Sequence, residues 1–198
     1  MNGKSTESLT LKFYKKFNVD SIIDSVNSFN EEWDIDTSRQ NLSYENVGRK
    51  NPHRFTKTYM IQYHDLYWIL GEKFVTKVMS NNENLIKQID PIKQYLEEQV
   101  DGTVARILIV KLGSESSIDR HVDSGDYLET SRRFHIPLIT NESVIFEVDG
   151  DKKHLRSGEI WQINNMKPHS VENKRGERVH LIIDVMPKWA IDMGNSSV

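Results

Sequence analysis

The hydrophobic pattern divides the chain into two regions with different periodicity. Up to about residue 102, apolar residues recur at the spacing of one helix face, which predicts helices over about 19–31 and 66–79. A third helix is predicted to begin at Asp90, because an acid suits the N-cap and Pro91 would then take the first helical position, where its missing N–H costs nothing. The first region is therefore expected to be mainly helical.

Two segments of this first region lack a helical pattern. Residues 9–17 fit either a first strand or a docking arm. Residues 34–58, rich in Asn, Arg, Ser and Lys, indicate a long loop that includes one short strand. Long loops in compact domains are often functional or disordered. With Arg49, Lys50, His53 and Arg54, this loop is a candidate to cover a carboxylate-bearing substrate, although a solvated loop is the simpler interpretation.

The hydrophobic pattern changes from helical to strand-like at about Thr103. Short runs rich in β-branched and aromatic residues are separated by Gly, Asn, Asp and Pro, and they predict strands over 104–112, 133–139, 144–148, 159–163 and 178–186. Short strands at such intervals are typical of a sandwich or a barrel. At 198 residues we expect one domain, 1–198, in which the helical and loop part, 1–102, packs on a β core, 103–187.

The last predicted strand has two faces of different character. One face is apolar and is expected to pack against the helices, and the other carries Arg178, His180, Ile182 and Asp184. The polar face would then look into the barrel.

Composition limits the kinds of metal site and of binding partner that the chain can have. The chain has no cysteine and seven histidines, so any metal must be bound by His, Asp or Glu. A formal charge of −3 with scattered basic residues argues against nucleic-acid binding. No apolar run reaches the roughly 20 residues that span a bilayer, and the N-terminus has no signal pattern, so we expect a soluble, cytoplasmic protein without a membrane partner.

One constellation fits a metal site. His121 and Asp123 form a His-x-Asp, whose side chains project to the same side of an extended segment. Alone, this pair also fits a solvated surface. His169 lies at the end of a later predicted strand, and a barrel can bring it to the pair as a third ligand. Two histidines and one carboxylate leave three open positions on an octahedral ion, which is the arrangement of non-haem Fe(II) oxygenases.

Basic residues on the inward strand faces fit an anionic ligand. Arg178 opens the last strand, where its guanidinium can clamp a carboxylate, although a surface ion pair is the simpler reading of Arg178 alone. Arg133 and His135 share the face opposite to Phe134 and Ile136. A buried charge needs a partner, and a dianionic ligand would supply one, unless this strand merely has one wet face.

These motifs together resemble a known family in order and spacing. They run through His121–Gly125, Arg133–Leu138, Gly158–Asn165, His169–Asn173 and Arg178–Val185. The chain thus resembles, over roughly 103–187, the aspartyl/asparaginyl β-hydroxylase family of Fe(II)- and 2-oxoglutarate-dependent dioxygenases. The resemblance implies a mainly β fold with N-terminal helices, a double-stranded β-helix or jelly roll of the cupin type.

The resemblance also implies the cofactors and their ligands. Fe(II) would bind His121, Asp123 and His169, and 2-oxoglutarate would place its distal carboxylate on Arg178. Its metal-proximal end would be assisted by Arg133 and His135, with O2 as the oxidant.

The substrate stays open at this point. The animal β-hydroxylases that name the family look to lack the carboxylate ligand, whereas Asp123 completes a triad more like that of bacterial members and proline hydroxylases. The expected reaction is hydroxylation of a C–H bond in a free amino acid or in a peptidyl, Asp/Asn-like residue, with release of succinate and CO2. The alternatives are a non-oxidative cupin-like barrel that binds a metal or a carboxylate, as an isomerase or a ligand-binding module, and a structural interaction domain.

The remaining four histidines are expected to have packing or surface roles. His180 is expected to be packed and hydrogen-bonded near the cosubstrate, and His53, His64 and His154 are expected at the surface.

Overall fold

Two antiparallel β-sheets form the body of the protein in the computed structural model, which describes residues 9–41, 50–64 and 74–195. The seven-stranded sheet has the order β1 (Leu11–Lys16), β9 (Glu159–Ile163), β6 (Arg132–Ile139), β11 (Arg178–Pro187), β4 (Gly102–Leu112), β2 (Thr56–His64) and β3 (Thr76–Val78). The four-stranded sheet has the order β5 (Ser116–His121), β10 (His169–Asn173), β7 (Val144–Val148) and β8 (Asp151–Lys153).

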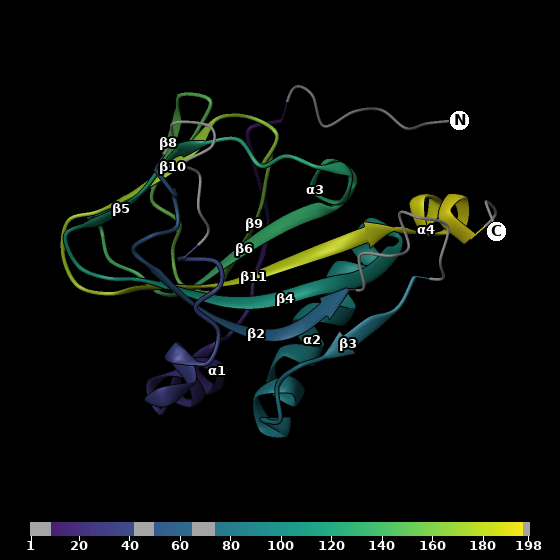
Figure 1. Ribbon diagram of the computed structural model, residues 1–198, viewed down its shortest axis with the longest axis horizontal. Coiled ribbons are helices and arrows are strands. Elements are labelled where there is room, and N and C mark those ends of the chain that lie inside the picture. The colour runs from purple at the N-terminus through teal and green to yellow at the C-terminus, as the bar shows by residue number, and fades with distance from the viewer. Residues whose placement is uncertain (1–8, 42–49, 65–73, 196–198) are drawn as a thin grey trace.

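Helices cover the outer face of the larger sheet. In Figure 1, α1 (Asp20–Asn27) and α2 (Glu83–Val100) lie below this sheet, and β5, β8 and β10 of the smaller sheet lie above it. The short helix η2 (Glu31–Asp34) follows α1, α3 (Asp126–Thr130) follows β5, and α4 (Lys188–Asn195) ends the described chain. Within the described residues, no helix combines the length and apolarity that a membrane crossing needs.

Strand β11 separates two environments, as its alternation predicts. One side contributes apolar residues to a core shared with both helices: Val179, Leu181, Ile183 and Val185 from the strand, Ile22 and Val26 from α1, and Leu85, Ile89, Ile92 and Leu96 from α2. The other side carries buried Arg178, His180 and Asp184. The space between the sheets also holds an apolar cluster that includes Phe146 and Val171. The predicted jelly-roll architecture, mainly β with N-terminal helices, is therefore present, and its polar side lies inside.

The third predicted helix begins earlier than its sequence signal. Helix α2 starts at Glu83, so Pro91 lies inside it. Its N-cap is Asn82, whose side chain accepts a hydrogen bond from the Leu85 N–H at 3.0 Å. An interior proline costs about 3 kcal/mol. Each fully buried Leu or Ile contributes roughly 1.5–3 kcal/mol, so the buried stripe of α2 outweighs that cost.

The first region is also less helical than predicted. It contributes β1, β2 and β3 to the larger sheet, so the interpretation of 9–17 as a strand is confirmed. The predicted helix over 66–79 is wrong at its C-terminal end, where Thr76–Val78 pairs with β2, while 65–73 lie outside the described residues. Tertiary pairing with β2 overrides the local periodicity there.

Candidate active site

The sheet register brings two of the predicted metal ligands side by side. His121 ends β5 and His169 begins β10, where the two residues are directly paired, and their ring centroids lie 4.2 Å apart. Asp123 follows β5, and its Oδ1 lies 3.6 Å from His121 Nε2. The Asp123 N–H donates to the Asn165 carbonyl at 3.0 Å, which ties together the two loops that carry these residues. His121 thus lies beside both His169 and Asp123 at one end of the smaller sheet.

The hydrogen bonds of the two histidines decide which ring nitrogen could bind a metal. Nδ1 of His121 lies 2.7 Å from the Asp119 carbonyl oxygen, and Nδ1 of His169 lies 2.9 Å from that of Lys167. A carbonyl only accepts, so each Nδ1 carries the proton and each Nε2 keeps its lone pair. His121 Nε2 is buried and has no hydrogen-bond partner among the described residues.

Burial also keeps both rings neutral. It lowers the pKa of His121, and it lowers the pKa of His169 to about 4. Two neutral imidazoles and one carboxylate form a donor set of N and O atoms that suits Fe(II), so the residues present fit the ion that the sequence implies.

A buried ion-pair network supports Asp123. Arg133 donates from Nε and Nη2 to Asp184, each at 2.8 Å, and from Nη1 to Asp123 Oδ2. Asp184 also accepts from the Tyr127 hydroxyl at 3.2 Å and lies 3.6 Å from Arg106 Nε. Burial opposes ionisation of Asp184, but the nearby Arg133 charge outweighs it, so the pKa of Asp184 lies below its usual range.

The same network holds Asp123 in one orientation. Burial would raise the pKa of Asp123, yet Arg133 and the nearby histidines lower it below the usual range. Because Arg133 occupies Oδ2, Oδ1 is the oxygen that faces His121. A direct contact between Arg133 and a cosubstrate stays a prediction, since all three donor nitrogens used here already have carboxylate partners.

Arg178, unlike Arg133, has no carboxylate partner among the described residues. Its side chain is fully buried, and its Nη2 donates to His180 Nδ1 at 2.8 Å, while Nε and Nη1 have no hydrogen-bond partner in the described part of the chain. Burial, with a smaller effect from Arg39, lowers the pKa of Arg178 to about 9. A buried, uncompensated guanidinium fits the distal carboxylate of 2-oxoglutarate.

Two neutral histidines line the approach to Arg178. His135 Nδ1 lies 3.4 Å from His180 Nδ1. Burial holds the pKa of each ring well below its usual range, and Arg178 lowers both further. The expectation that His180 is packed and hydrogen-bonded matches its position.

Two histidines assigned to the surface from the sequence are buried. His64 has no exposed surface and stacks on Tyr127 at 3.7 Å between ring centroids. His53 is 8% exposed, and its ring lies 5.0 Å from that of His121. A ligand atom from each of His53, His121 and Asp123 lies within 4.8 Å of the other two, so His53 is a site residue that the sequence interpretation missed.

The partner of His53 decides what the ring can do. Arg39 Nη2 lies 3.2 Å from His53 Nε2. A guanidinium only donates, so Nε2 accepts and the proton of His53 lies on Nδ1. In this arrangement neither nitrogen offers a lone pair to a metal, whereas His121 and His169 both do.

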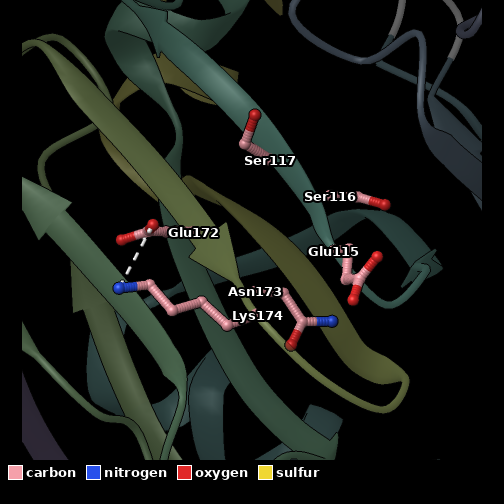
Figure 2. A pocket seen from close by; sticks show the side chains of 6 residues that line it. All are labelled: Glu115, Ser116, Ser117, Glu172, Asn173 and Lys174. Atoms are coloured by element: carbon pink, nitrogen blue, oxygen red, sulfur yellow. Dashed lines mark ion pairs between the residues drawn. The ribbon is translucent and has the colours of Figure 1, made fainter.

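A cavity of about 750 Å³ opens beside these residues and is lined by Pro52, His53, His121, Asp123 and Leu128 among others. A second hollow, of about 320 Å³, lies at the opposite end of the β5–β10 pair (Figure 2), where Glu115, Ser116, Ser117, Glu172, Asn173 and Lys174 surround it. Its Lys174–Glu172 ion pair is exposed, and its lining includes no histidine. The first cavity is therefore the candidate reaction site.

Comparison with curated proteins gives a relative of related chemistry. The chain is 30% identical over 102 residues to an L-proline cis-4-hydroxylase of Rhizobium meliloti (strain 1021). The match covers 50% of this chain and 36% of that relative.

Solved structures share the fold at low sequence identity. The viral collagen prolyl hydroxylase of Paramecium Bursaria Chlorella virus-1 is 10% identical, with a TM-score of 0.58 over 93% of this chain and 99% of that chain. A prolyl hydroxylase of Trichoplax adhaerens is 11% identical, with a TM-score of 0.58 over 96% of this chain and 88% of that chain. These likenesses confirm the double-stranded β-helix.

The family assignment rests on a longer match. The family model described as aspartyl/asparaginyl β-hydroxylase matches residues 25–187. These include every predicted metal and cosubstrate residue, as well as Arg39 and His53. The chain belongs to the aspartyl/asparaginyl β-hydroxylase family.

Proposed function

We propose that this protein is an Fe(II)- and 2-oxoglutarate-dependent dioxygenase that hydroxylates a C–H bond of an amino-acid or peptidyl substrate. The observation that carries the proposal is the state of Arg178: a fully buried guanidinium without a carboxylate partner among the described residues. Arg178 and Asp184 lie on the same side of β11, and Arg133 links Asp184 to Asp123, so the proposed metal residues and Arg178 face one interior. A dicarboxylate that reaches from the metal to Arg178 satisfies both ends.

His121, Asp123 and His169 would hold the metal in this proposal. When bound, Fe(II) and 2-oxoglutarate supply the oxidation, in which one oxygen atom of O2 enters the substrate C–H bond and the other enters succinate, with loss of CO2. Asp123 would offer Oδ1 to the metal, because Arg133 already bonds Oδ2. Its one negative charge would join two neutral imidazoles in the donor set.

Arg178 would set the depth of 2-oxoglutarate in the barrel. Because His180 accepts from its Nη2, the guanidinium is fixed with Nε and Nη1 left for the distal carboxylate. We also assign Arg133 and His135 to the cosubstrate pocket, with Arg133 acting mainly through Asp123. The neutral state of His135 and His180 avoids two further positive charges beside Arg178.

The relatives support the general class of substrate. The curated relative is named for L-proline, and the family model for aspartyl and asparaginyl residues. An amino acid, free or within a peptide, is the chemistry that these names share.

Anaerobic reconstitution tests the proposal. The purified protein is mixed with Fe(II) and then with 2-oxoglutarate, and the weak visible metal-to-ligand absorption band is recorded before O2 is admitted and succinate is assayed. We expect a band that requires both components, and succinate formation that follows it. Neither band nor succinate in a folded protein would contradict the proposal and would favour a non-oxidative barrel.

A further inference from the structure

The buried charges around the candidate active site do not balance. Arg133 and Arg106 face two carboxylates, Asp184 and Asp123. Two further arginines, Arg178 and Arg39, form no ion pair with any residue in the described ranges 9–41, 50–64 and 74–195. Arg178 is fully buried, and Arg39 is half-buried with a buried Nη1. Because an unpaired charge in such a place is costly, these two arginines without carboxylates indicate two external anionic groups.

The backbone of Arg39 is anchored to the loop that carries His53. The Asn51 side chain donates to the carbonyls of Arg39 and Gln40, each at 2.9 Å, and accepts from the His53 N–H at 2.8 Å. Arg54, in the same loop, binds Asp119 near the end of β5 at 2.5 Å. Through these bonds, the segment that carries Arg39 is attached to the strand that carries His121.

The guanidinium of Arg39 lies among the groups of the active site. Nη2 is bound by His53, and Nη1 is buried without a hydrogen-bond partner among the residues described. His53 in turn lies beside His121, with 5.0 Å between the two ring centroids. Burial, followed by the repulsion of Arg133, lowers the pKa of Arg39 to about 10, while the charges of Asp123 and Asp184 act in the opposite direction. No described carboxylate forms an ion pair with Arg39, so its Nη1 is left for an external anion.

We propose that Arg39, oriented by His53, binds a carboxylate of the substrate and restricts the enzyme to amino acids that carry a free carboxylate. This inference rests on the proposed function, in which the two carboxylates of 2-oxoglutarate are already assigned to the metal and to Arg178. A further carboxylate near Arg39 then has to come from the substrate. An internal, non-acidic residue of a peptide has no free carboxylate, whereas every free amino acid has one, so free amino acids are the favoured class.

His53 acts in this proposal as a positioning residue. Its Nε2 accepts from Nη2 at one end of the guanidinium and thereby fixes the orientation of Arg39.

The experiment uses matched acids and amides as probes. The proteinogenic L-amino acids other than Asp and Glu are tested as free acids and as α-carboxamides against the Zn(II) form with 2-oxoglutarate, and binding is read from the thermal shift. The same series is then tested for a +16 Da product with Fe(II) and O2. The variants are Arg39→Gln, Arg39→Lys and, as a control that removes an exposed arginine, Arg156→Gln.

We expect at least one free acid to bind the wild type about tenfold or more tightly than its amide, as a charge-assisted contact predicts. Arg39→Gln should reduce that preference to near one, Arg39→Lys should retain part of it, and Arg156→Gln should retain all of it. Without ligands, Arg39→Gln should melt at a higher temperature than the wild type, because an uncompensated charge is removed.

Three outcomes would overturn the inference: an unchanged acid preference in Arg39→Gln, amide binding equal to acid binding in the wild type, or no probe bound at all. A loss of stability in ligand-free Arg39→Gln would also overturn it, because Arg39 would then be structural. Failure of the proposed function is a separate result, in which 2-oxoglutarate itself gives no thermal shift with the metal-loaded wild type.

Discussion

Arg133 binds Asp184 through two parallel hydrogen bonds, from Nε to Oδ1 and from Nη2 to Oδ2, both 2.8 Å long. The two residues are directly paired across β6 and β11, so the strand register itself creates the contact. The remaining Nη1 of Arg133 binds Asp123. Asp184 thus acts on the proposed metal site through one rigid guanidinium, although it is not a metal ligand in our proposal.

Replacing Asp184 tests this relationship. Asp184→Asn leaves buried Arg133 and half-buried Arg106 with one carboxylate, so we expect the free energy of unfolding to fall by roughly 3–5 kcal/mol. Metal affinity should fall as well, by about 10- to 100-fold, because Arg133 is no longer fixed beside Asp123. Urea denaturation and a Zn(II) titration measure the two effects.

The matched control is Asp192→Asn, in an exposed ion pair with Lys188 at 3.1 Å. It should change stability by less than about 1 kcal/mol. Equal effects of the two substitutions would show that the Asp184 network does not support the site.

Removing individual side chains tests which residues bind the metal. We expect His169→Ala and Asp123→Ala to lower metal affinity by more than about 100-fold and to abolish succinate formation without unfolding the protein. His53→Ala should keep metal binding, because its Nε2 is already used by Arg39.

His154→Ala is the control for the loss of an imidazole, since its Nδ1 also faces a main-chain carbonyl, that of Val144 at 3.1 Å, but on the far part of β7. Metal titration monitored by calorimetry separates these variants. Strong metal binding by His169→Ala together with its loss in His53→Ala would reassign the third ligand.

The role of Arg178 gives a kinetic prediction. Arg178→Ala should raise the KM for 2-oxoglutarate by roughly 30-fold or more, because the distal carboxylate loses its charged partner. Arg132→Ala, on the same sheet but half-buried and bonded to the Thr130 carbonyl at 3.2 Å, should leave that KM unchanged. An unchanged KM in Arg178→Ala would remove this residue from the cosubstrate site.

Much of the barrel interior is predictable because strand alternation is local. The inward face of β11 can be read from its sequence, and His121 and Asp123 lie two residues apart on one extended segment. The partner of Arg133 was not predictable, because the choice between Asp184 and an external dianion depends on the register between β6 and β11. Register arises from long-range pairing rather than from local pattern.

The contribution of Arg39 and His53 could not be predicted from the sequence for a different reason. Both lie in segments without helix or strand periodicity, and both reach the site through specific bonds made by Asn51. The available signals were the Asn51-Pro52 turn and the basic residues and His53 of a long loop, for which a solvated surface was the simpler interpretation. Such a turn indicates that the chain changes direction there, but it does not indicate toward which surface the chain then runs.

The start of helix α2 at Glu83, rather than at Pro91, can be tested by substitution. Pro91 is exposed and lies in the interior of Glu83–Val100, so Pro91→Ala restores an N–H that can donate to the carbonyl of Lys87. We expect the substitution to stabilise the protein by about 1–3 kcal/mol, as measured by urea denaturation. If the helix began at Pro91, as its sequence signal suggested, the same substitution would have almost no effect or would destabilise the protein.

The buried histidines predict a pH dependence of stability. Burial and the Arg178 charge hold the pKa values of His135 and His180 well below that of an unfolded chain, which is about 6.5. As the pH falls below about 6.5, the unfolded chain takes up protons that the folded protein does not, so unfolding becomes more favourable. The metal-free protein should therefore lose stability between about pH 7.5 and pH 5.5, by up to about 1.4 kcal/mol per pH unit for each such ring.

Substitution of one ring isolates its share of this effect. Because Asp123 and Asp184 have pKa values below the usual range of a carboxyl, they stay ionised in the folded protein throughout this window and do not produce the slope. His180→Gln should make the dependence shallower by about one proton, measured as the change with pH of the urea-derived free energy of unfolding. A wild-type stability that is flat from about pH 7.5 to pH 5.5 would mean that His135 and His180 accept protons in the folded state, and the neutral pocket proposed for 2-oxoglutarate would have to be abandoned.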